Sequence, residues 1–252
     1  MIRIRNLAKN YGGFQAVKKL DLDIQPGEIF GFLGPNGAGK TTTISMLTGL
    51  LKPSQGEVFL KGLDLQKRPV EAKRVFGYVP DTPVLYEKLT LMEFMKFIQE
   101  IYRLDSVESK DRLERLLELF ELEEKMDALI GSFSRGMRQK AAIISALLPE
   151  PDILILDEPT NGLDPKAVKR LKDLLLDETK RGVTVFMSTH ILEIAEKMSH
   201  RIGIIREGEL VAIGTMSEIR QLRNEDTSRH HAGDLEGLFL ELTGGDTYAH
   251  LD

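Results

Sequence analysis

The chain contains the segment Gly34-Pro35-Asn36-Gly37-Ala38-Gly39-Lys40-Thr41, which joins a short apolar run at residues 28–33 to a helical pattern at residues 39–51. Its spacing, Gly-x-x-x-x-Gly-Lys-Ser/Thr, is that of a phosphate-binding loop. Glycine lets backbone N–H groups turn inward around phosphate oxygens, and the N-terminus of the following helix adds partial positive charge. The segment and its strand-loop-helix context therefore predict a nucleotide-binding site.

Two side chains at the end of this loop have predicted roles. Lys40 can reach the β- and γ-phosphates of a nucleotide, which gives it a part in catalysis. The hydroxyl of Thr41 can bind Mg²⁺. We expect the nucleotide and its ion to contact the following residues of the loop: Asn36, Gly37, Ala38, Gly39, Lys40, Thr41 and Thr42.

A second apolar run, at residues 152–157, ends in the carboxylates of Asp157 and Glu158. Beside a phosphate loop, the first of two such carboxylates holds Mg²⁺, commonly through water, and the second can act as general base on the attacking water. Ligands of α/β sheets bind at the carboxyl ends of strands. A strand that only leaves the sheet into the polar turn at 159–162 would show the same residues, but the phosphate loop favours the catalytic interpretation.

Tyr11 and His190 are candidates with two interpretations each. An aromatic ring at position 11 can stack on a nucleotide base, or it can be a core tyrosine at the turn before Gly12-Gly13. An imidazole at position 190 can donate a hydrogen bond to a γ-phosphate and so sense hydrolysis. From the residue alone, a histidine at a helix start or in the core is favoured.

The composition excludes several classes of protein. The 252 residues include 34 Lys and Arg against 39 Asp and Glu, a net charge of −5, which argues against bulk nucleic-acid binding. The absence of cysteine excludes disulfides and thiolate catalysis. The longest apolar stretch, residues 141–148, is far shorter than the ~20 residues that span a bilayer, and the start of the chain has no signal-peptide pattern. We expect a cytoplasmic chain that reaches a membrane through a partner.

The alternation of strand and helix patterns predicts an α/β core with parallel pairing. From about residue 83 the pattern becomes mostly helical and acidic, and Thr90 and Glu93 form a capping box ahead of a helix. We predict four parts, namely an N-terminal part of the core at 1–82, a helical subdomain at 83–150, the C-terminal part of the core at 151–220 and a polar tail at 221–252.

The tail carries two weak signals. His230 and His231 could bind a metal, but adjacent histidines in a polar tail are usually solvated, and a structural site would need further ligands. The apolar residues Leu235, Leu238, Phe239 and Leu242 could form one face of a small amphipathic helix that docks on the core or on a partner.

Seven segments together resemble the nucleotide-binding domain of the ATP-binding cassette (ABC) family. They occur in the family's order and cover about residues 1–220. They are Tyr11, the phosphate loop, Tyr78-Val-Pro-Asp81, Ser134-Arg-Gly136, Leu156-Asp-Glu-Pro-Thr160, Gly162-Leu-Asp164 and Ser188-Thr-His190. The joint pattern is much more specific than any single segment.

The resemblance implies a fold and a function. The fold class is α/β, a P-loop NTPase (RecA-like) core with an antiparallel β subdomain in its N-terminal part and an inserted α-helical subdomain. Two subunits, identical or different, would bind ATP and Mg²⁺ head to tail, between the phosphate loop of one and the signature loop of the other. Their ATPase activity would drive separate transmembrane permease subunits at the inner face of the cell membrane. The run 134–140 looks like a branch of bacterial ABC proteins that work with exporter-type subunits.

The resemblance also assigns roles by position. His190 resembles the γ-phosphate switch, which reverses the interpretation from the residue alone, and Tyr11 resembles the adenine-stacking residue. Val17 would pack near the ribose, and Asp164 would belong to the loop that links the two sites. Asp157 resembles the Mg²⁺ carboxylate and Glu158 the catalytic base.

The signature segment departs from the family pattern. The family usually has Leu-Ser-Gly-Gly-Gln where this chain has Phe133-Ser134-Arg135-Gly136-Met137. Ser134 and Gly136 are kept, so a hydroxyl, backbone amides and a helix start still make a phosphate site for the nucleotide of the second subunit. Arg135 adds a cation that reaches either phosphate or solvent.

Asp81 stands where the family usually has a glutamine that touches Mg²⁺ and the attacking water and couples to the helical subdomain. Aspartate is one methylene shorter and negatively charged, so it could bind the metal through water but also repels phosphate. We expect Asp81 to join Thr41 and Asp157 in the metal site, with coupling kept and metal geometry altered.

Three other functions compete with transport. A soluble ABC ATPase acting on DNA or ribosomes is disfavoured because the sequence has no long coiled-coil insertion, second cassette or basic stripe. A regulatory nucleotide binder with little turnover is disfavoured by the retained Glu158 and His190. A small-molecule kinase or GTPase is disfavoured because neither an Asn-Lys-x-Asp guanine motif nor an acceptor-substrate motif is evident.

Overall fold

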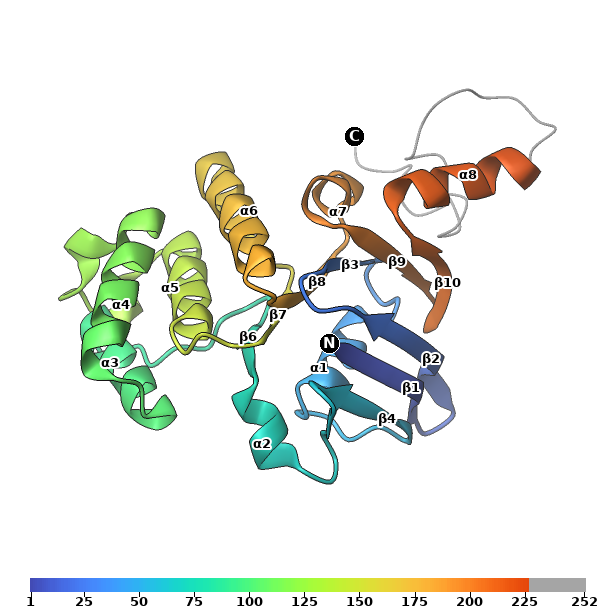
Figure 1. The fold of residues 1–252 in the computed structure, drawn as a ribbon, viewed down its shortest axis with the longest axis horizontal. Coiled ribbons are helices and arrows are strands. Elements are labelled where there is room, and N and C mark those ends of the chain that lie inside the picture. The colour runs from blue at the N-terminus through green and yellow to red at the C-terminus, as the bar shows by residue number, and fades with distance from the viewer. Residues whose placement is uncertain (227–252) are drawn as a thin grey trace.

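A computed structural model describes residues 1–226, and its strands form two sheets (Figure 1). The smaller, antiparallel sheet has the order β2-β1-β4-β5 and consists of β1 (Ile2–Tyr11), β2 (Phe14–Ile24), β4 (Gln55–Leu60) and β5 (Leu63–Asp64). The larger sheet has the order β10-β9-β3-β8-β7-β6. It consists of β3 (Ile29–Leu33), β6 (Phe76–Val79), β7 (Ile153–Asp157), β8 (Thr184–Thr189), β9 (Arg201–Arg206) and β10 (Glu209–Gly214). All its pairs are parallel except β9 with β10.

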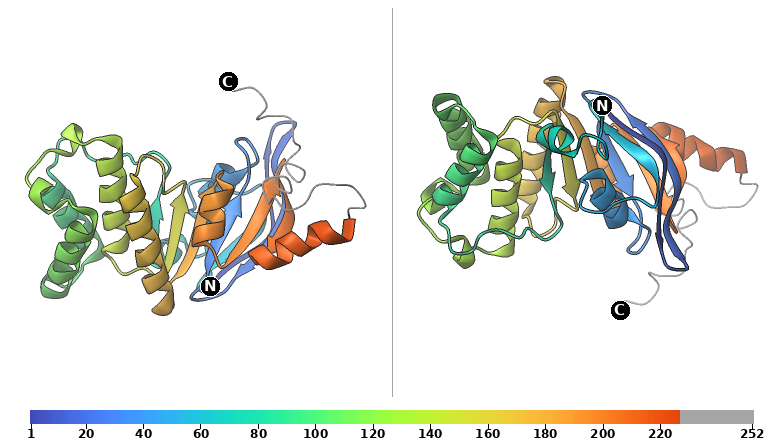
Figure 2. Two further views of the ribbon diagram at one scale, coloured as in Figure 1. Left: turned by 90° about the horizontal axis from the view of Figure 1, so that it is seen from above. Right: turned by 90° about the horizontal axis from the view of Figure 1, so that it is seen from below.

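The helices form two groups. Those outside the segment between β6 and β7 are α1 (Lys40–Leu47), α2 (Pro69–Arg74), α6 (Pro165–Lys180), α7 (Leu192–Met198) and α8 (Met216–Asp226). The others are α3 (Leu91–Tyr102), α4 (Ser106–Phe120), α5 (Arg135–Leu147) and the 3-10 turns η1 (Glu123–Lys125) and η2 (Ile130–Ser132). Figures 1 and 2 show the second group gathered at the end of the molecule opposite the antiparallel sheet.

The central strands of the larger sheet are covered on both faces. Every residue of β3, β7 and β8 is buried, which explains why these segments read as nearly continuous apolar runs rather than alternating ones. Along β7, Ile153 and Ile155 pack into the core shared with the antiparallel sheet and α1. Leu154 and Leu156 pack into the core shared with α3–α6. Because successive side chains of a strand point to opposite faces of the sheet, β7 contributes side chains to both cores.

The order of the parallel strands brings three loops to one edge of the sheet. Leu33, the last residue of β3, pairs with Thr189 of β8, and Ser188 pairs with Asp157 of β7. The loops that leave these strands therefore begin side by side. This edge holds the phosphate loop, the two acidic residues and His190.

Local signals account for where two helices begin and end. The predicted capping box is confirmed, since Thr90 and Glu93 each bond the other's backbone N–H at the start of α3. The prediction that the first helix runs to residue 51 is wrong, because α1 ends at Leu47. Its C-cap, Thr48, bonds its hydroxyl to Ile44 O, and Gly49 follows with a φ of 67°, which closes the last turn.

Within residues 1–226, no helix combines the length and the apolar character that a membrane crossing requires. The predicted features of the tail at His230, His231, Leu235, Leu238, Phe239 and Leu242 lie outside the described residues.

Candidate nucleotide site

Residues 34–39 of the phosphate loop join β3 to α1. They bound a cavity of about 340 Å³. Gly39 has a φ of 106°, and a Cβ there would lie 2.7 Å from Ala16 O, so only glycine fits this turn. The lining residues come from the β1–β2 hairpin, the loop, the start of α1 and two acidic positions. They are Tyr11, Phe14, Ala16, Pro35, Asn36, Gly37, Gly39, Lys40, Thr41, Thr42, Asp81 and Glu158.

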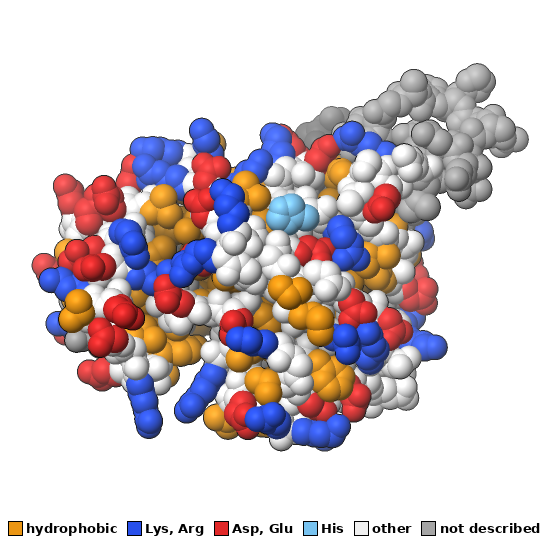
Figure 3. Space-filling model, viewed as in Figure 1, with side chains coloured by type: hydrophobic (Ala, Val, Ile, Leu, Met, Phe, Trp, Pro, Cys, Tyr) orange, Lys and Arg blue, Asp and Glu red, His pale blue; other side chains and the backbone are white. Residues whose placement is uncertain are grey.

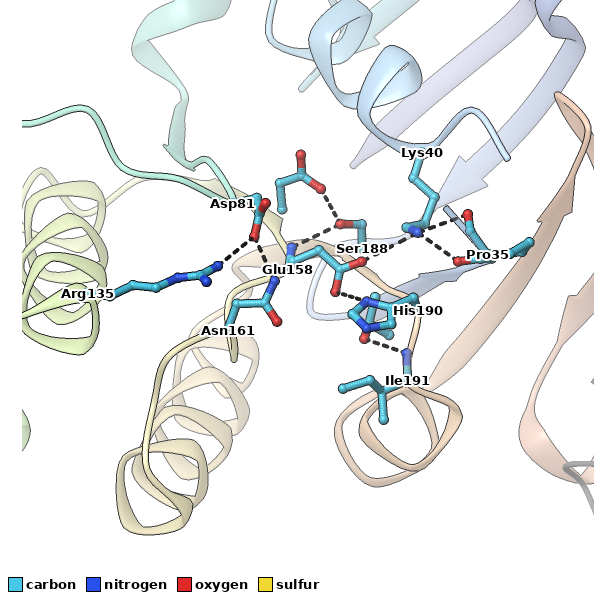
Figure 4. Close-up of polar contacts among 12 residues, drawn as sticks. Pro35, Lys40, Asp81, Arg135, Glu158, Asn161, Ser188, His190 and Ile191 are labelled. Atoms are coloured by element: carbon cyan, nitrogen blue, oxygen red, sulfur yellow. Dashed lines mark hydrogen bonds and ion pairs between the residues drawn. The ribbon is translucent and has the colours of Figure 1, made fainter. Parts of the chain in front are cut away.

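Lys40 lies at the base of this cavity and is buried. Its Nζ donates to Gly34 O at 2.7 Å and to Pro35 O at 3.3 Å, and it lies 3.4 Å from Oε1 of Glu158 (Figure 4). A buried ammonium held by carbonyls and one carboxylate is placed to take up a phosphate from the cavity.

Ser188 joins the two acidic residues. Its hydroxyl donates to Oδ1 of Asp157 and accepts from the backbone N–H of Glu158 at 3.0 Å (Figure 4). Both carboxyl residues are buried. The serine thus fixes Asp157 within the sheet and fixes the backbone of Glu158 at the sheet edge.

Glu158 adopts a left-handed backbone with a φ of 47°, an uncommon conformation for a residue with a side chain. Its Oε2 lies 3.0 Å from Nδ1 of His190, while its Oε1 faces Lys40. The contact with the imidazole does not have hydrogen-bond geometry, and Oε2 accepts no hydrogen bond from a described residue. The carboxylate therefore lies between two cations or donors with unused acceptor capacity.

Two ionisable groups at this edge are shifted by burial. Burial raises the pKa of Asp157, and the charges of Glu158 and Asp81 add to the rise, while the Ser188 hydroxyl and Lys40 oppose it. Burial and the nearby charges of Asp157 and Asp81 raise the pKa of Tyr78 to about 12. Negative charge at this edge is thus only partly compensated by the protein's own cations.

The β1–β2 hairpin supplies the aromatic wall. Tyr11 and Phe14 pair across the hairpin and are 50% and 66% exposed, so both rings are open to a ligand. Nζ of Lys9 lies 5.2 Å from the centre of the Tyr11 ring. Val17 and Ala38 are buried in the core, and Ala16 rather than Val17 lines the cavity.

The predicted signature residues lie at the start of α5, outside the wall of this cavity. Ser134 caps the helix by accepting from Met137 N–H. Gly136 lies against Gly162, since a Cβ on Gly136 would be 2.5 Å from Gly162 O. Ser134, Arg135 and Gly136 therefore do not line the cavity of their own chain.

Asp81 and Asp164 have partners outside the phosphate loop. Oδ1 of Asp81 accepts from Nδ2 of Asn161 at 2.7 Å and lies 3.8 Å from Nη2 of Arg135 (Figure 4). Asp164 caps α6 by accepting from Ala167 N–H, a bond that lowers its pKa, and lies 3.7 Å from Nζ of Lys140.

The family is decided by a family model described as ABC transporter, which matches residues 17–161. The chain belongs to the ABC transporter family. It is 38% identical to the ABC-type transporter ATP-binding protein EcsA of Bacillus subtilis, over 98% of each protein. It is 37% identical to the Nod factor export ATP-binding protein I of Cupriavidus metallidurans, over 87% of this chain and 72% of that protein.

Two solved structures extend the comparison. An ATP-binding subunit of an ABC transporter has a TM-score of 0.89 and 35% identity, over 96% of this chain and 99% of the other. A dimeric post-hydrolysis state of the ATP-binding cassette MJ0796, bound to ADP and Pi, has a TM-score of 0.75 and 28% identity, over 86% and 99%. The predicted fold class is thereby confirmed, and the chain is an ATP-binding ABC transporter subunit and an ATPase.

Sequence reasoning missed four residues of this ABC cassette that act on its candidate site. Ser188 donates a hydrogen bond to Asp157, and Asn161 donates one to Asp81. Phe14 widens the aromatic wall. Gln139 of α5 donates to Pro159 O, with a distance of 3.3 Å between the two atoms. Ser188 stood inside a predicted motif, but its contact with Asp157 depends on β7 and β8 being neighbours. The strand order is the missing signal.

Proposed function

We propose that this ABC ATPase hydrolyses ATP in the cavity beside the phosphate loop and that Glu158 is the general base. The observation that carries the proposal is the setting of the Glu158 carboxylate in the cavity wall. It is buried, 3.4 Å from the Lys40 ammonium, and its Oε2 accepts no hydrogen bond from a described residue. A buried acceptor oxygen that lies beside an imidazole but accepts no hydrogen bond from the protein suits a group that receives a proton from water.

The other residues of the site support the same reaction. Glu158 would take a proton from water as the water oxygen bonds to the γ-phosphorus and the bond to the β-phosphate oxygen breaks, which leaves ADP and phosphate. Lys40 would exchange its carbonyl partners for phosphate oxygens. His190 would donate a hydrogen bond to the γ-phosphate from its position beside Glu158. Most of the catalytic effect would then be positioning and charge stabilisation.

The site residues also fit Mg²⁺. Thr41 and Asp81 line the cavity, and Asp157 ends β7 directly before Glu158, so oxygen donors of the kind that Mg²⁺ prefers come from the edge of the sheet that carries the cavity. Within residues 1–226, no three His, Cys, Asp or Glu side chains could hold a metal together. We therefore expect the phosphates to bring most of the ligands, with Thr41 and Asp157 completing them. When bound, the ion would neutralise charge on the phosphates.

The proposal includes a head-to-tail pair of subunits. Ser134, Arg135 and Gly136 are outside the cavity of their own chain, so a phosphate site at the start of α5 would serve the nucleotide of a second subunit. The dimeric form of the cassette MJ0796 supports this arrangement. Asp164, at the start of α6, would lie on the loop that links the two sites.

The proposal also includes export through separate membrane subunits, with this chain at the inner face of the membrane. The Nod factor export protein among its relatives supports that direction. An apolar group beside Asp81 offers a contact surface for a membrane subunit. In this group Val84 is 93% and Tyr86 58% exposed, and the Tyr86 ring packs on exposed Phe97 of α3.

The charges on the surface do not favour a nucleic-acid partner. Figure 3 shows Lys and Arg interspersed with Asp and Glu over the drawn face, which gives no basic stripe there for nucleic acid.

The proposed base is tested by Glu158→Gln, which keeps the size of the side chain but removes its basicity. We expect kcat for phosphate release to fall at least about 100-fold, while the Kd for ATP stays within about threefold. Glu114→Gln, on the exposed face of α4, is the matched control and should leave both constants unchanged. A kcat for Glu158→Gln within about tenfold of wild type would contradict the assignment.

A further inference from the structure

Arg135 and Asp81, the two positions where this chain departs from the usual family residues, contact each other. Nη2 of Arg135 lies 3.8 Å from Oδ1 of Asp81 (Figure 4). The Arg135 side chain reaches this position by lying across Gly162, where its Cγ and Cδ would be 3.1 and 3.3 Å from an added Cβ. The same Asp81 oxygen accepts from Asn161. The loop after β6, the loop after β7 and the start of α5 therefore meet at one carboxylate.

The two ends of this ion pair belong to different nucleotide sites in the proposed dimer. Asp81 lines the cavity that holds the nucleotide of its own chain. Arg135 is the first residue of α5, whose N-terminus we propose to face the nucleotide of the second subunit. The guanidinium can bind a phosphate or the Asp81 carboxylate through the same donors. The two contacts therefore compete for one cation.

We propose that Asp81 is a positioning residue that holds Arg135 back from the phosphate of the second subunit. The pair makes the signature loop of a chain depend on the state of that chain's own nucleotide cavity. By linkage, any event in the cavity that weakens the pair favours association of the two subunits by the same factor. This inference rests on the proposed dimer.

The size of the effect follows from the exposure of the pair. The side chains of Arg135 and Asp81 are 65% and 45% exposed, so water and salt screen their attraction. Each exposed pair of this kind changes an equilibrium by about 1.4- to fivefold. That change is small for protein stability but measurable in a dimer dissociation constant.

The test is a double-mutant cycle in a Glu158→Gln parent, in which ATP is bound but not turned over. Asp81→Asn keeps an acceptor for Asn161 and removes the charge that holds Arg135, and Arg135→Gln removes the cation. The dimer Kd with ATP and Mg²⁺ is measured by sedimentation, after ATP binding by each variant has been checked. Asp111→Asn, an exposed position of α4, is the control for a change in net charge.

We expect Asp81→Asn to tighten the dimer about two- to 25-fold, because each of its two chains loses one pair. We expect Arg135→Gln to weaken the dimer, and Asp81→Asn to have no effect once Arg135 is replaced. Equal tightening by Asp81→Asn in both backgrounds would overturn the inference, because Asp81 would then act on phosphate directly. No change on Asp81→Asn would also overturn it. A parent that binds ATP but stays monomeric would contradict the proposed dimer itself.

Discussion

Asp157 and Glu158 are adjacent in the chain, but their carboxylates have different surroundings. Asp157 ends β7 and receives the Ser188 hydroxyl, whereas Glu158 turns toward Lys40 through a left-handed backbone. A positive φ costs a residue with a side chain roughly 1–2 kcal/mol, and the bond from Glu158 N–H to Ser188 helps to hold it. The strain gives one carboxylate to the cavity and leaves the other in the sheet.

The buried charge of Asp157 should make the folded chain less stable at neutral pH. Burial, Glu158 and Asp81 raise the pKa of Asp157 above its ordinary value of 3.8, so the folded state holds this proton more tightly than the unfolded state. Stability is therefore lost as the pH rises from 3.8 through the raised pKa. Asp157→Asn removes this penalty and still accepts from Ser188.

We expect Asp157→Asn to raise the free energy of unfolding at neutral pH, without nucleotide or metal, and the gain over wild type to shrink as the pH falls toward 3.8. Urea unfolding at several pH values measures both effects. A variant that is less stable than wild type at neutral pH would show that the charge of Asp157 is needed for folding.

Motif spacing predicted which residues meet at the site but not how they are held. Lys40, Glu158 and His190 come together as expected because each follows a strand of one parallel sheet. Asn161 and Ser188 could not be assigned contacts, because these depend on which strands are neighbours and on the path of the loop after Glu158. The roles of the predicted residues stay predictions.

At the scale of elements, α5 is fastened to the loop that follows Glu158. Gln139 donates to Pro159 O, Lys140 faces Asp164, and Gly136 lies against the Gly162 carbonyl. These contacts join the start of the signature helix to the residues after the proposed base. A change in either segment should therefore be felt in the other.

Gly136→Ala tests the closeness of this packing. In a helix, glycine to alanine normally stabilises by roughly 0.5–1 kcal/mol. Here the new Cβ would lie 2.5 Å from Gly162 O, a backbone atom, so we expect a loss of about 1–3 kcal/mol in the free energy of unfolding. Gly13→Ala is the control, since a Cβ there meets nothing within 4 Å. A stabilised Gly136→Ala variant would mean that α5 is not held against this loop.

A second linkage joins α4 to α6 through buried charge. Arg112 contacts Glu178 at 3.3 Å with both side chains over nine-tenths buried, and it also donates to Leu147 O and to Glu150. Removing one partner of a buried pair leaves an uncompensated charge. Arg181, 3.3 Å from Glu178, would compensate only from the exposed side.

We expect Arg112→Met to lower the free energy of unfolding by roughly 3 kcal/mol, and Glu178→Gln added to it to restore part of that loss. Asp177→Asn removes only the exposed contact with Lys180 and should leave stability almost unchanged. Chemical denaturation of these three variants and the wild type gives the comparison. Equal stability of Arg112→Met and wild type would show that packing alone holds α4 on the core.

Elements with strong local signals were predictable, and short ones were not. The capping box at Thr90 and Glu93 matches the predicted start of α3. The six-residue α2 and the two-residue β5 were not predicted, because they are too short to show a hydrophobic period.

In the molecule as a whole, the phosphate loop and the signature loop lie on different layers. The phosphate loop belongs to the layer between the sheets, and the signature loop belongs to the helical end shown in Figure 2. The pattern change near residue 83 pointed to this separation, although the boundaries at 82, 150 and 220 stay predictions. In the proposed dimer, one chain would supply both halves of a site but direct them apart, which a single sequence cannot show without the sheet order.

Completion of each ATP site by two chains is tested by the mass of Glu158→Gln in solution with and without ATP and Mg²⁺. We expect a monomer without nucleotide and a dimer with it, while wild type returns to monomer as it hydrolyses the ATP. A Glu158→Gln chain that binds ATP and remains monomeric at every accessible concentration would contradict the account.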